Sequence, residues 1–309
     1  MVSNNSLNRP WSTQMEMTFG CDNKCPFCYK QVLHKPKGEY DFMTPDTAYE
    51  ISSKMKKAGW DGIRLEFAMR GEPFLNPYLY KNINIFRKNL PSSQILVTTN
   101  GNHLNPEKAV KFFKAGGNIL LVDCYKNDIE KRKKIYKDFT VYDYYDDDFN
   151  PYHRHNPKTT HAICLMENIA LKNNEMKTRV LLNMGGNVDY KRIKRFGVTP
   201  IEAPYEKKCV KPFREIIFMW DGTIPLCCED ADRQYVLGNI FKIDDLSIFW
   251  QKNKKLNLCR LLLFNKNRYN APCKNCDFTG GMRIGFIPKM KILSKDEIKK
   301  VQKVMERYL

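Results

Sequence analysis

Short apolar runs alternate with stretches of helical period over the first 124 residues. The runs are rich in Ile, Leu, Val, Met and Phe, and most of them are followed by a turn residue. They predict buried strands over residues 15–19, 63–69, 95–99 and 119–124.

Helix signals lie between these strands. Thr44 and Pro45 suit the N-cap and the first position of a helix that ends near Gly59. Further helices are expected after Asn76-Pro77 and after Asn105-Pro106. Alternation of strand and helix predicts a parallel sheet with crossover helices, in which functional residues gather at the carboxyl ends of the strands.

The C-terminal part of the chain has a different pattern. Residues 216–220 and 223–227 flank Asp221-Gly222, which predicts a hairpin, and Pro225 suggests an edge strand. Near the C-terminus, Ser294 and Glu297 form a capping box ahead of an amphipathic helix.

The composition is that of a globular protein. Hydrophobic residues make up 42% and aromatic residues 12% of the 309 residues, enough for one large domain or two smaller ones. No apolar run reaches 18 residues and the polar N-terminus has no signal-peptide core, so we expect a cytoplasmic protein with no membrane span. Because the cytosol keeps thiols reduced, the 11 cysteines point to metal binding rather than disulfides.

The net charge of +18 has two interpretations. It is either the surface of a protein that binds nucleic acid or a phosphorylated substrate, or a spread of solvated lysines, which we favour. Two stretches concentrate the excess: residues 251–268 carry six basic and no acidic residues, and residues 286–309 carry seven basic and three acidic ones.

Three cysteines follow the first predicted strand in the pattern Cys21-x3-Cys25-x2-Cys28. Three thiolates on so short a loop can converge on one metal site. A zinc ion or a four-iron cluster normally takes four protein ligands, so a three-thiolate cluster leaves one iron open. Gly71-Glu72-Pro73 and Asn100-Gly101 follow the next two strands, which puts them at the same edge of the sheet.

The cysteine loop and these strand ends resemble those of the radical S-adenosylmethionine (SAM) enzymes. The resemblance implies a partial (β/α)6 barrel in which Cys21, Cys25 and Cys28 hold a 4Fe-4S cluster. The open iron then binds SAM, and one electron cleaves SAM to a 5′-deoxyadenosyl radical that abstracts a hydrogen atom from the substrate. The structural alternative is a zinc knuckle or a set of free thiols.

The resemblance also implies residues that bind SAM. Gly71-Glu72-Pro73 is similar to the family's Gly-Gly-Glu-Pro motif, which holds the SAM amino group, but Arg70 replaces the first glycine. Phe27 corresponds to the aromatic residue beside the adenine. Asn100 and Asp123 are candidates for contacts with ribose or substrate, and a turn or capping role is the alternative for both. No residue is identified as the catalytic base.

A second set of cysteines lies in the C-terminal part. Four thiolates are enough to close a cluster, and they resemble the auxiliary 4Fe-4S ligands of SPASM or twitch domains: Cys209, Cys227, Cys273 and Cys276. Their spacing is most similar to that of the 2-deoxy-scyllo-inosamine dehydrogenases. A structural zinc site is the alternative. Cys228 would point away from Cys227 on a strand and is left out, although the two could exchange roles.

Between the two cysteine sets the pattern is weaker. We expect residues 125–158 to form an ordinary loop over the barrel mouth, with a substrate-contacting lid as the alternative, and His153, His155 and His161 to form no metal site. Strands should resume over residues 162–165 and 179–184. The expected domains are a partial barrel (1–200), an auxiliary-cluster domain (201–285) and a C-terminal helix packed on the barrel (286–309).

Together these features predict an oxidoreductase of the radical SAM type that acts on a small polar metabolite such as a sugar or cyclitol. The auxiliary cluster would accept an electron, and a flavodoxin or ferredoxin would supply electrons to the first cluster. The alternatives are a peptide-modifying enzyme, a nucleotide- or nucleic-acid-modifying enzyme, and a metal-containing module that binds nucleic acid without catalysis.

Overall fold

The computed structural model describes residues 8–23, 25, 28, 38–124, 128–144, 146–167, 206–278 and 290–308. The strand expected over residues 179–184 and the adenine-binding candidate Phe27 lie outside these residues. So do the boundaries proposed at residues 200 and 285, which stay predictions.

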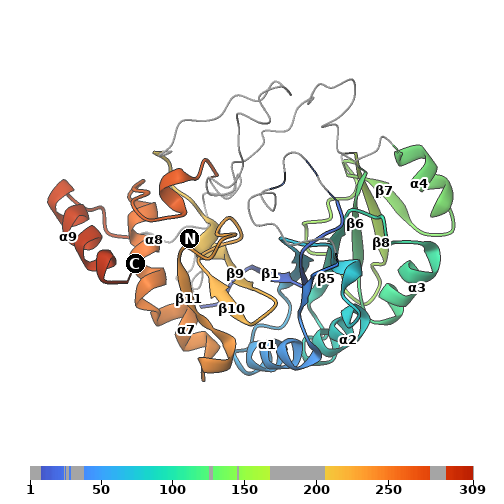
Figure 1. Ribbon diagram of the computed structural model, residues 1–309, viewed down its shortest axis with the longest axis horizontal. Coiled ribbons are helices and arrows are strands. Elements are labelled where there is room, and N and C mark those ends of the chain that lie inside the picture. The colour runs from blue at the N-terminus through green and yellow to red at the C-terminus, as the bar shows by residue number, and fades with distance from the viewer. Residues whose placement is uncertain are drawn as a thin grey trace.

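A parallel sheet of seven strands forms the centre of the fold (Figure 1). Its order is β7-β8-β6-β5-β4-β1-β9, and every neighbouring pair is parallel. The strands are β1 (Ser12–Glu16), β4 (Arg64–Ala68), β5 (Gln94–Thr99), β6 (Ile119–Cys124), β7 (Val141–Asp143), β8 (Ala162–Glu167) and β9 (Glu215–Phe218). The parallel α/β sheet predicted from the alternating pattern is confirmed.

Helices cover one face of this sheet. They are α1 (Pro45–Lys57), α2 (Leu79–Asn89), α3 (Pro106–Lys114) and α4 (Ile129–Ile135). Their starts follow the local sequence, since the Thr44 hydroxyl accepts a hydrogen bond from the Thr47 amide at 3.2 Å, and Asn105 caps α3 in the same way. At the end of α1, Gly59 has a φ of +70°, which glycine adopts without strain.

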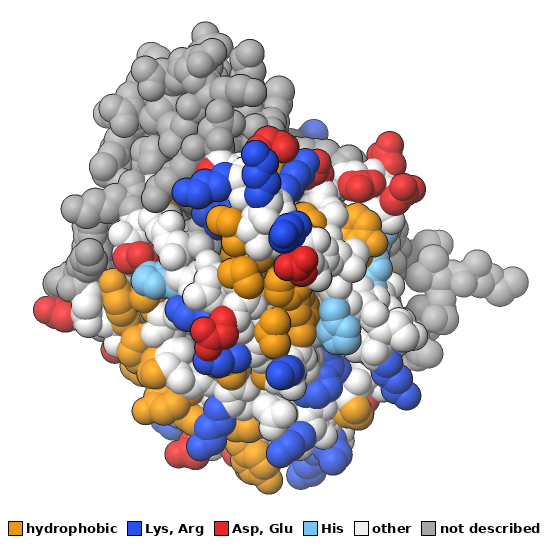
Figure 2. All heavy atoms as spheres, turned by 90° about the vertical axis from the view of Figure 1, so that its right-hand side faces the viewer, with side chains coloured by type: hydrophobic (Ala, Val, Ile, Leu, Met, Phe, Trp, Pro, Cys, Tyr) orange, Lys and Arg blue, Asp and Glu red, His pale blue; other side chains and the backbone are white. Residues whose placement is uncertain are grey.

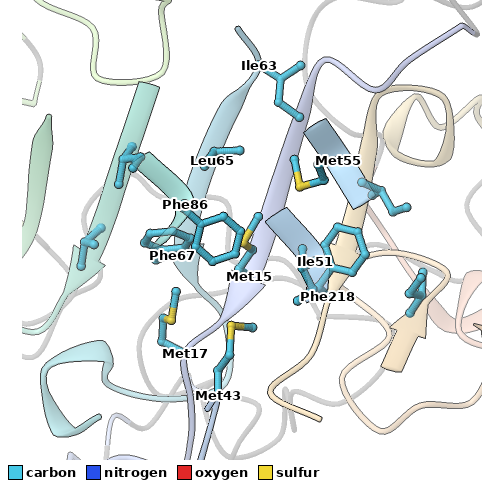
Figure 3. Close-up of a cluster of buried hydrophobic side chains, with 14 of the residues drawn as sticks. Met15, Met17, Met43, Ile51, Met55, Ile63, Leu65, Phe67, Phe86 and Phe218 are labelled. Carbon is cyan, nitrogen blue, oxygen red and sulfur yellow. The ribbon is translucent and has the colours of Figure 1, made fainter. Parts of the chain in front are cut away.

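Apolar side chains fill the layer between the sheet and these helices. Figure 3 shows Met15, Leu65 and Phe67 of the strands close to Ile51, Met55 and Phe86 of α1 and α2. All of them are fully buried. This layer is the main hydrophobic core, and it holds the strands rigidly so that their carboxyl ends can position a site.

The opposite, inner face of the sheet carries more polar side chains. Residues in register on neighbouring parallel strands point to the same face. One row contains Ser12, Arg64, Gln94 and Glu215, and the next contains Gln14, Glu66, Leu96 and Ile119. A smaller apolar cluster on this face includes Leu96, Ile119, Leu121 and Phe149.

Residues 146–161 close the amino-terminal end of the inner face. Gln94, at the start of β5, donates to the Pro151 carbonyl at 3.1 Å and accepts from the His155 amide at 2.7 Å. Arg64, at the start of β4, donates to the Tyr152 carbonyl at 3.0 Å. The expectation of a loop over the barrel mouth is wrong for these residues, because β7 and β8 are parallel and the chain must return to the amino-terminal edge between them.

The predicted hairpin forms its turn but not its ladder. The Met219 amide donates to the Thr223 carbonyl at 2.9 Å across Asp221-Gly222. However, β9 joins the large sheet beside β1, while β10 (Thr223–Pro225) pairs with β11 (Val236–Asn239). The predicted pairing of the two hairpin strands is therefore wrong. The edge of β1 gives β9 a buried parallel partner instead.

The remaining elements complete the C-terminal part, where the capping box of Ser294 and Glu297 is present. They are α6 (Lys211–Arg214), α7 (Leu246–Lys252), α8 (Lys254–Phe264) and α9 (Lys295–Met305). In the N-terminal part, the short strands β2 (Thr18–Phe19) and β3 (Asp41–Phe42) pair with each other. Helix α9 lies beside α8 (Figure 1), and Gln302 donates to Asn267 just beyond α8 at 3.2 Å. These contacts are with α8 and its end, and the expected packing of this helix on the barrel stays a prediction. Within the described residues, the helices are too short or too polar to cross a membrane.

Candidate active site at the carboxyl ends of the strands

The base of the cysteine loop is joined directly to the Gly-Glu-Pro turn. Gly20 and Gly71 form a parallel β-bridge, and the Glu72 amide donates to the Gly20 carbonyl at 3.1 Å. Gly71 has no space for a side chain, since a Cβ atom there would lie 2.0 Å from the Thr18 carbonyl oxygen and 2.6 Å from that of Gly20. Only glycine allows the two strand ends to approach this closely.

Glu72 ties the turn to the end of β5. The Thr99 hydroxyl donates to its Oε1 at 2.6 Å, and the Asn100 amide donates to Oε2 at 2.8 Å. The Phe74 amide also donates to Oε1, at 3.0 Å, while Pro73 begins a single 3-10 turn. Burial raises the pKa of Glu72 and these hydrogen bonds oppose the rise. The carboxylate is thus held in one orientation by three donors.

The loop after β5 contacts the cysteine loop through side chains. Asn100 Nδ2 lies 3.5 Å from Cys21 Sγ and 3.4 Å from Asp22 Oδ1. Asn102 donates to Asn23 Oδ1 at 2.7 Å, and His103 Nε2 lies 2.8 Å from Asp22 Oδ2. The structure therefore brings Asn100 to the cysteine loop, as expected from its place at a strand end.

Asp22 and His103 form a pair that the sequence alone did not single out. Burial raises the pKa of Asp22, but hydrogen bonding and charge from His103 outweigh it and lower the pKa below its usual value. The sequence does place both residues near the predicted site, since His103 follows Asn100 by three residues and Asp22 follows Cys21. What was missing was the direction in which each side chain points.

The first three cysteines are half-buried. Cys21 Sγ accepts a hydrogen bond from the Asn23 amide at 3.4 Å, and the Cys28 amide donates to the Cys25 carbonyl at 3.1 Å. The thiolate is the form of cysteine that binds iron. These residues fit a metal cluster bound at the loop.

Asp123 lies on the inner face at the end of β6. It is in register with Met166 of β8 and 9% exposed. Its charge acts on the half-buried Tyr152, whose pKa is raised by burial of the phenol and further by Glu66, Tyr144 and Asp123. Asp123 and Glu66 therefore face the same interior as the phenol of Tyr152.

The four C-terminal cysteines are brought together from three separate segments. Cys227 interacts electrostatically with Cys273 and Cys276, and both of these interact with Cys209. Each of the four is buried, with 6 to 8% of its surface exposed. Adjacent Cys228 lies beside Lys211 and 3.6 Å from the carboxylate of Glu229, which also acts on Cys227 and Cys276.

The chemistry of this set fits a bound metal cluster. Burial raises the pKa of all four thiols, to about 12 for Cys276. Four neighbouring buried thiols ionise together only when a cation compensates their charge. Arg268, 4% exposed, lies behind them and donates to the Cys276 carbonyl at 3.0 Å and the Phe278 carbonyl at 2.7 Å. Arg268 is a further residue that the sequence did not point out.

Among the described residues, no three His, Cys, Asp or Glu side chains are grouped closely enough for a single metal ion. One zinc ion places its four sulfurs about 2.3 Å from a common centre. A four-iron cluster takes one thiolate per iron, so its ligands are spread more widely around the site.

Family models match both parts of the chain. Residues 15–142 match the radical SAM superfamily, and residues 209–277 match SPASM, an iron–sulfur cluster-binding domain. The two matches imply that this chain uses SAM, a 4Fe-4S cluster that binds SAM, and an auxiliary iron–sulfur cluster. None of the curated protein sequences matches the chain.

Solved structures of BtrN share the fold of this chain, and one further structure has a lower TM-score. The crystal structure of BtrN in complex with AdoMet and 2-DOIA has a TM-score of 0.65 and 20% identity, covering 87% of this chain and 94% of BtrN. An open conformation of BtrN has a TM-score of 0.58 and 16% identity, covering 87% and 93%. Streptococcus suis SuiB bound to precursor peptide SuiA has a TM-score of 0.49 and 11% identity, covering 80% and 66%.

Proposed function

We propose that this chain, which carries a radical SAM domain followed by a SPASM domain, oxidises a small polar metabolite by two electrons. Oxidation of an alcohol to a carbonyl releases one hydrogen atom, one electron and one proton. When bound, SAM and its cluster supply the radical that takes the hydrogen atom, and the auxiliary cluster takes the electron. The observation that carries this proposal is the coexistence of two distinct thiol sets, one of three and one of four.

The residues at the strand ends would hold SAM and its cluster. Cys21, Cys25 and Cys28 supply the thiolates, and Asn100 and the Asn23 amide stabilise Cys21 by donating to its sulfur. Gly71, Glu72 and Pro73 form the turn proposed to bind the amino group. Asn100 and Asp123 are proposed to contact ribose or substrate, and Phe27 the adenine.

The second set would hold the auxiliary cluster. Cys209, Cys227, Cys273 and Cys276 supply four thiolates, which leaves no iron open for substrate. Burial of all four, and of Arg268 behind them, keeps water from the sulfurs. A closed and buried cluster suits transfer of an electron, and a flavodoxin or ferredoxin stays the expected donor to the first cluster.

The inner face supports a small polar substrate. Glu66, Thr98 and Asp123 lie on this face, and their polar groups give it a character that suits a substrate with hydroxyl groups. Residues 146–161 close the far end, which limits access of water to the reacting atoms. The similar fold of BtrN, whose crystal structure is in complex with AdoMet and 2-DOIA, also supports this proposal.

Metal analysis and SAM cleavage test the first part of this proposal. Anaerobically reconstituted protein is expected to hold about eight irons per chain from two four-iron clusters. With dithionite and SAM it should release 5′-deoxyadenosine, and the variant with Cys21, Cys25 and Cys28 all changed to Ala should release none. Cys164→Ala, a buried strand cysteine outside both sets, is the control. Zinc without iron would contradict the proposal.

Loss of the auxiliary cluster should separate cleavage from oxidation. The Cys273→Ala/Cys276→Ala variant is expected to cleave SAM partly while forming no oxidised product. Substrate is identified by screening deuterated sugars and cyclitols for deuterium transfer into 5′-deoxyadenosine, with peptides as the comparison set. Transfer from a peptide but from no cyclitol or sugar would overturn the substrate class.

A further inference from the structure

Arg70 occupies the place of the first glycine in the Gly-Gly-Glu-Pro motif, and its side chain is almost completely buried. Its exposed fraction is 3%. Its Nε and Nη2 donate to the two carboxylate oxygens of Glu16 at 2.5 and 2.6 Å. Its guanidinium also lies over the ring of Phe19, 4.2 Å from the centroid. Arg70 is thus anchored to the end of β1 and to the segment that leads into the cysteine loop.

The same guanidinium reaches the auxiliary-cluster part of the chain. Nη1 donates to the Ala231 carbonyl at 2.6 Å, and Nη2 lies 3.6 Å from Met219 Sδ. Ala231 belongs to a tight turn that begins at Cys227, where the Asp230 amide donates to the Cys227 carbonyl at 3.1 Å. One side chain therefore spans from the motif to the turn that carries a proposed cluster ligand.

Both ends of this connection are internally stiff. At one end, the Arg70 carbonyl accepts from the Gly20 amide at 3.4 Å, next to the Gly20–Gly71 bridge. At the other, the fully buried Asp230 carboxylate accepts from the Gln234 amide at 2.8 Å and the Tyr235 amide at 3.0 Å. A shift at either end must therefore move the guanidinium or break its hydrogen bonds.

The geometry requires an arginine. The planar guanidinium binds the Glu16 carboxylate with one edge and keeps a further N–H for Ala231, whereas a lysine ammonium has no such fork. A buried, bidentate pair of this kind is strongly directional, and removing one partner leaves the other charge uncompensated.

We propose that Arg70 is a positioning residue that couples the SAM-binding motif to the auxiliary-cluster turn, residues 227–235. Binding of SAM at the motif then restricts motion of that turn through Arg70. This rests on the proposed function, because it takes SAM to bind at Gly71-Glu72-Pro73. Coupling between two sites is reciprocal. Removal of the auxiliary cluster from a protein that keeps Arg70 should therefore also weaken SAM binding.

Hydrogen exchange of the reconstituted protein, with and without SAM, tests the coupling. In the wild type, SAM should slow exchange in peptides covering residues 71–76 and residues 228–236, each at least several-fold. In Arg70→Lys, SAM should still slow exchange at 71–76, but the ratio at 228–236 should fall to about one. Glu16→Gln, which weakens the pair from its other side, should reduce the second ratio in the same way.

Arg233→Gln is the matched control. Arg233 lies in the same turn and carries the same charge, but it pairs with Asp221 at 2.6 Å, so the SAM response at 228–236 should persist. Equal slowing at 228–236 in the wild type and Arg70→Lys would overturn the coupling, as would slowing at 71–76 alone in the wild type. Absence of slowing at 71–76 in the wild type would instead overturn SAM binding at the motif, and with it the proposed function.

Discussion

At the scale of single residues, the adjacent Cys227 and Cys228 lie in different surroundings. Cys227 faces Cys273 and Cys276, and burial raises its pKa. Cys228 faces Lys211, Glu215 and Glu229, and burial raises its pKa as well, while Lys211 opposes the rise. The sequence placed Cys227 in the ligand set only by analogy and by alternation along a strand. Side-chain direction in the folded chain gives the physical reason for preferring it.

We expect the two cysteines to differ in iron content when each is replaced. Cys227→Ala removes one of four thiolates and should lower iron from about eight to about four per chain, with loss of the auxiliary cluster signal in electron paramagnetic resonance. Cys228→Ala removes no ligand and should keep about eight. Normal iron in Cys227→Ala together with depleted iron in Cys228→Ala would show that the two roles are reversed.

At the scale of secondary-structure elements, the segment between β7 and β8 determines how the inner face is closed. Its apolar part contributes Phe149, which stacks on Tyr142 with ring centroids 4.2 Å apart and joins the inner apolar cluster. Its backbone is bound by Arg64 and Gln94 from two different strands. An acidic, aromatic stretch without helical or strand period resembles an ordinary surface loop in sequence, and only these contacts distinguish it from one.

Removal of the Gln94 side chain should loosen this closure. Gln94 is 3% exposed, and Gln94→Ala leaves the Pro151 carbonyl and the His155 amide without this partner. We expect a loss of about 2 kcal/mol in the free energy of unfolding, measured by urea denaturation, and faster hydrogen exchange over residues 150–156. Gln251→Ala on the exposed surface of α7 should change stability by less than about 0.5 kcal/mol. Equal effects of the two changes would contradict the proposed closure.

At the scale of the whole molecule, the net charge of +18 is spread along the sequence, with a local excess in residues 251–268 and 286–309. Figure 2 shows Lys and Arg side chains scattered over one face among acidic, polar and apolar ones. In the basic stretch 251–268, Arg260 is fully buried, and it donates to the Pro212 and Trp250 carbonyls at 2.8 Å. Arg268 is buried behind the auxiliary cysteines, and Lys255 donates to the Val236 carbonyl at 2.6 Å.

Nucleic acid binding should accordingly be weak and non-specific. We expect dissociation constants on the order of 10⁻⁶ to 10⁻⁴ M for a single-stranded DNA or a transfer RNA, weakening steeply between 50 and 200 mM salt. Formation of 5′-deoxyadenosine from SAM should be unchanged when nucleic acid is added. Tight binding at 200 mM salt together with stimulation of SAM cleavage would favour a nucleic-acid substrate and contradict this expectation.

Local signals were enough to predict much of the fold and to propose the first cysteine site. Caps such as Thr44 and Asn105, and the apolar runs of the strands, depend on residues close together in the chain, so the sequence predicts them directly. The three thiols at 21, 25 and 28 are likewise neighbours in sequence. Their association with Gly71 and Asn100 followed from one topological rule, that carboxyl ends of parallel strands share an edge.

Tertiary structure decided what depends on side-chain direction and on pairing between distant segments. Arg70 looked like a departure from a motif, and only its contacts with Glu16 and Ala231 show that it joins two parts of the chain. The direction of residues 146–161 and the pairing of β9 with β1 were decided in the same way. For each of these features, the local sequence is compatible with more than one conformation. Burial and hydrogen bonding between residues far apart in the chain select one of them.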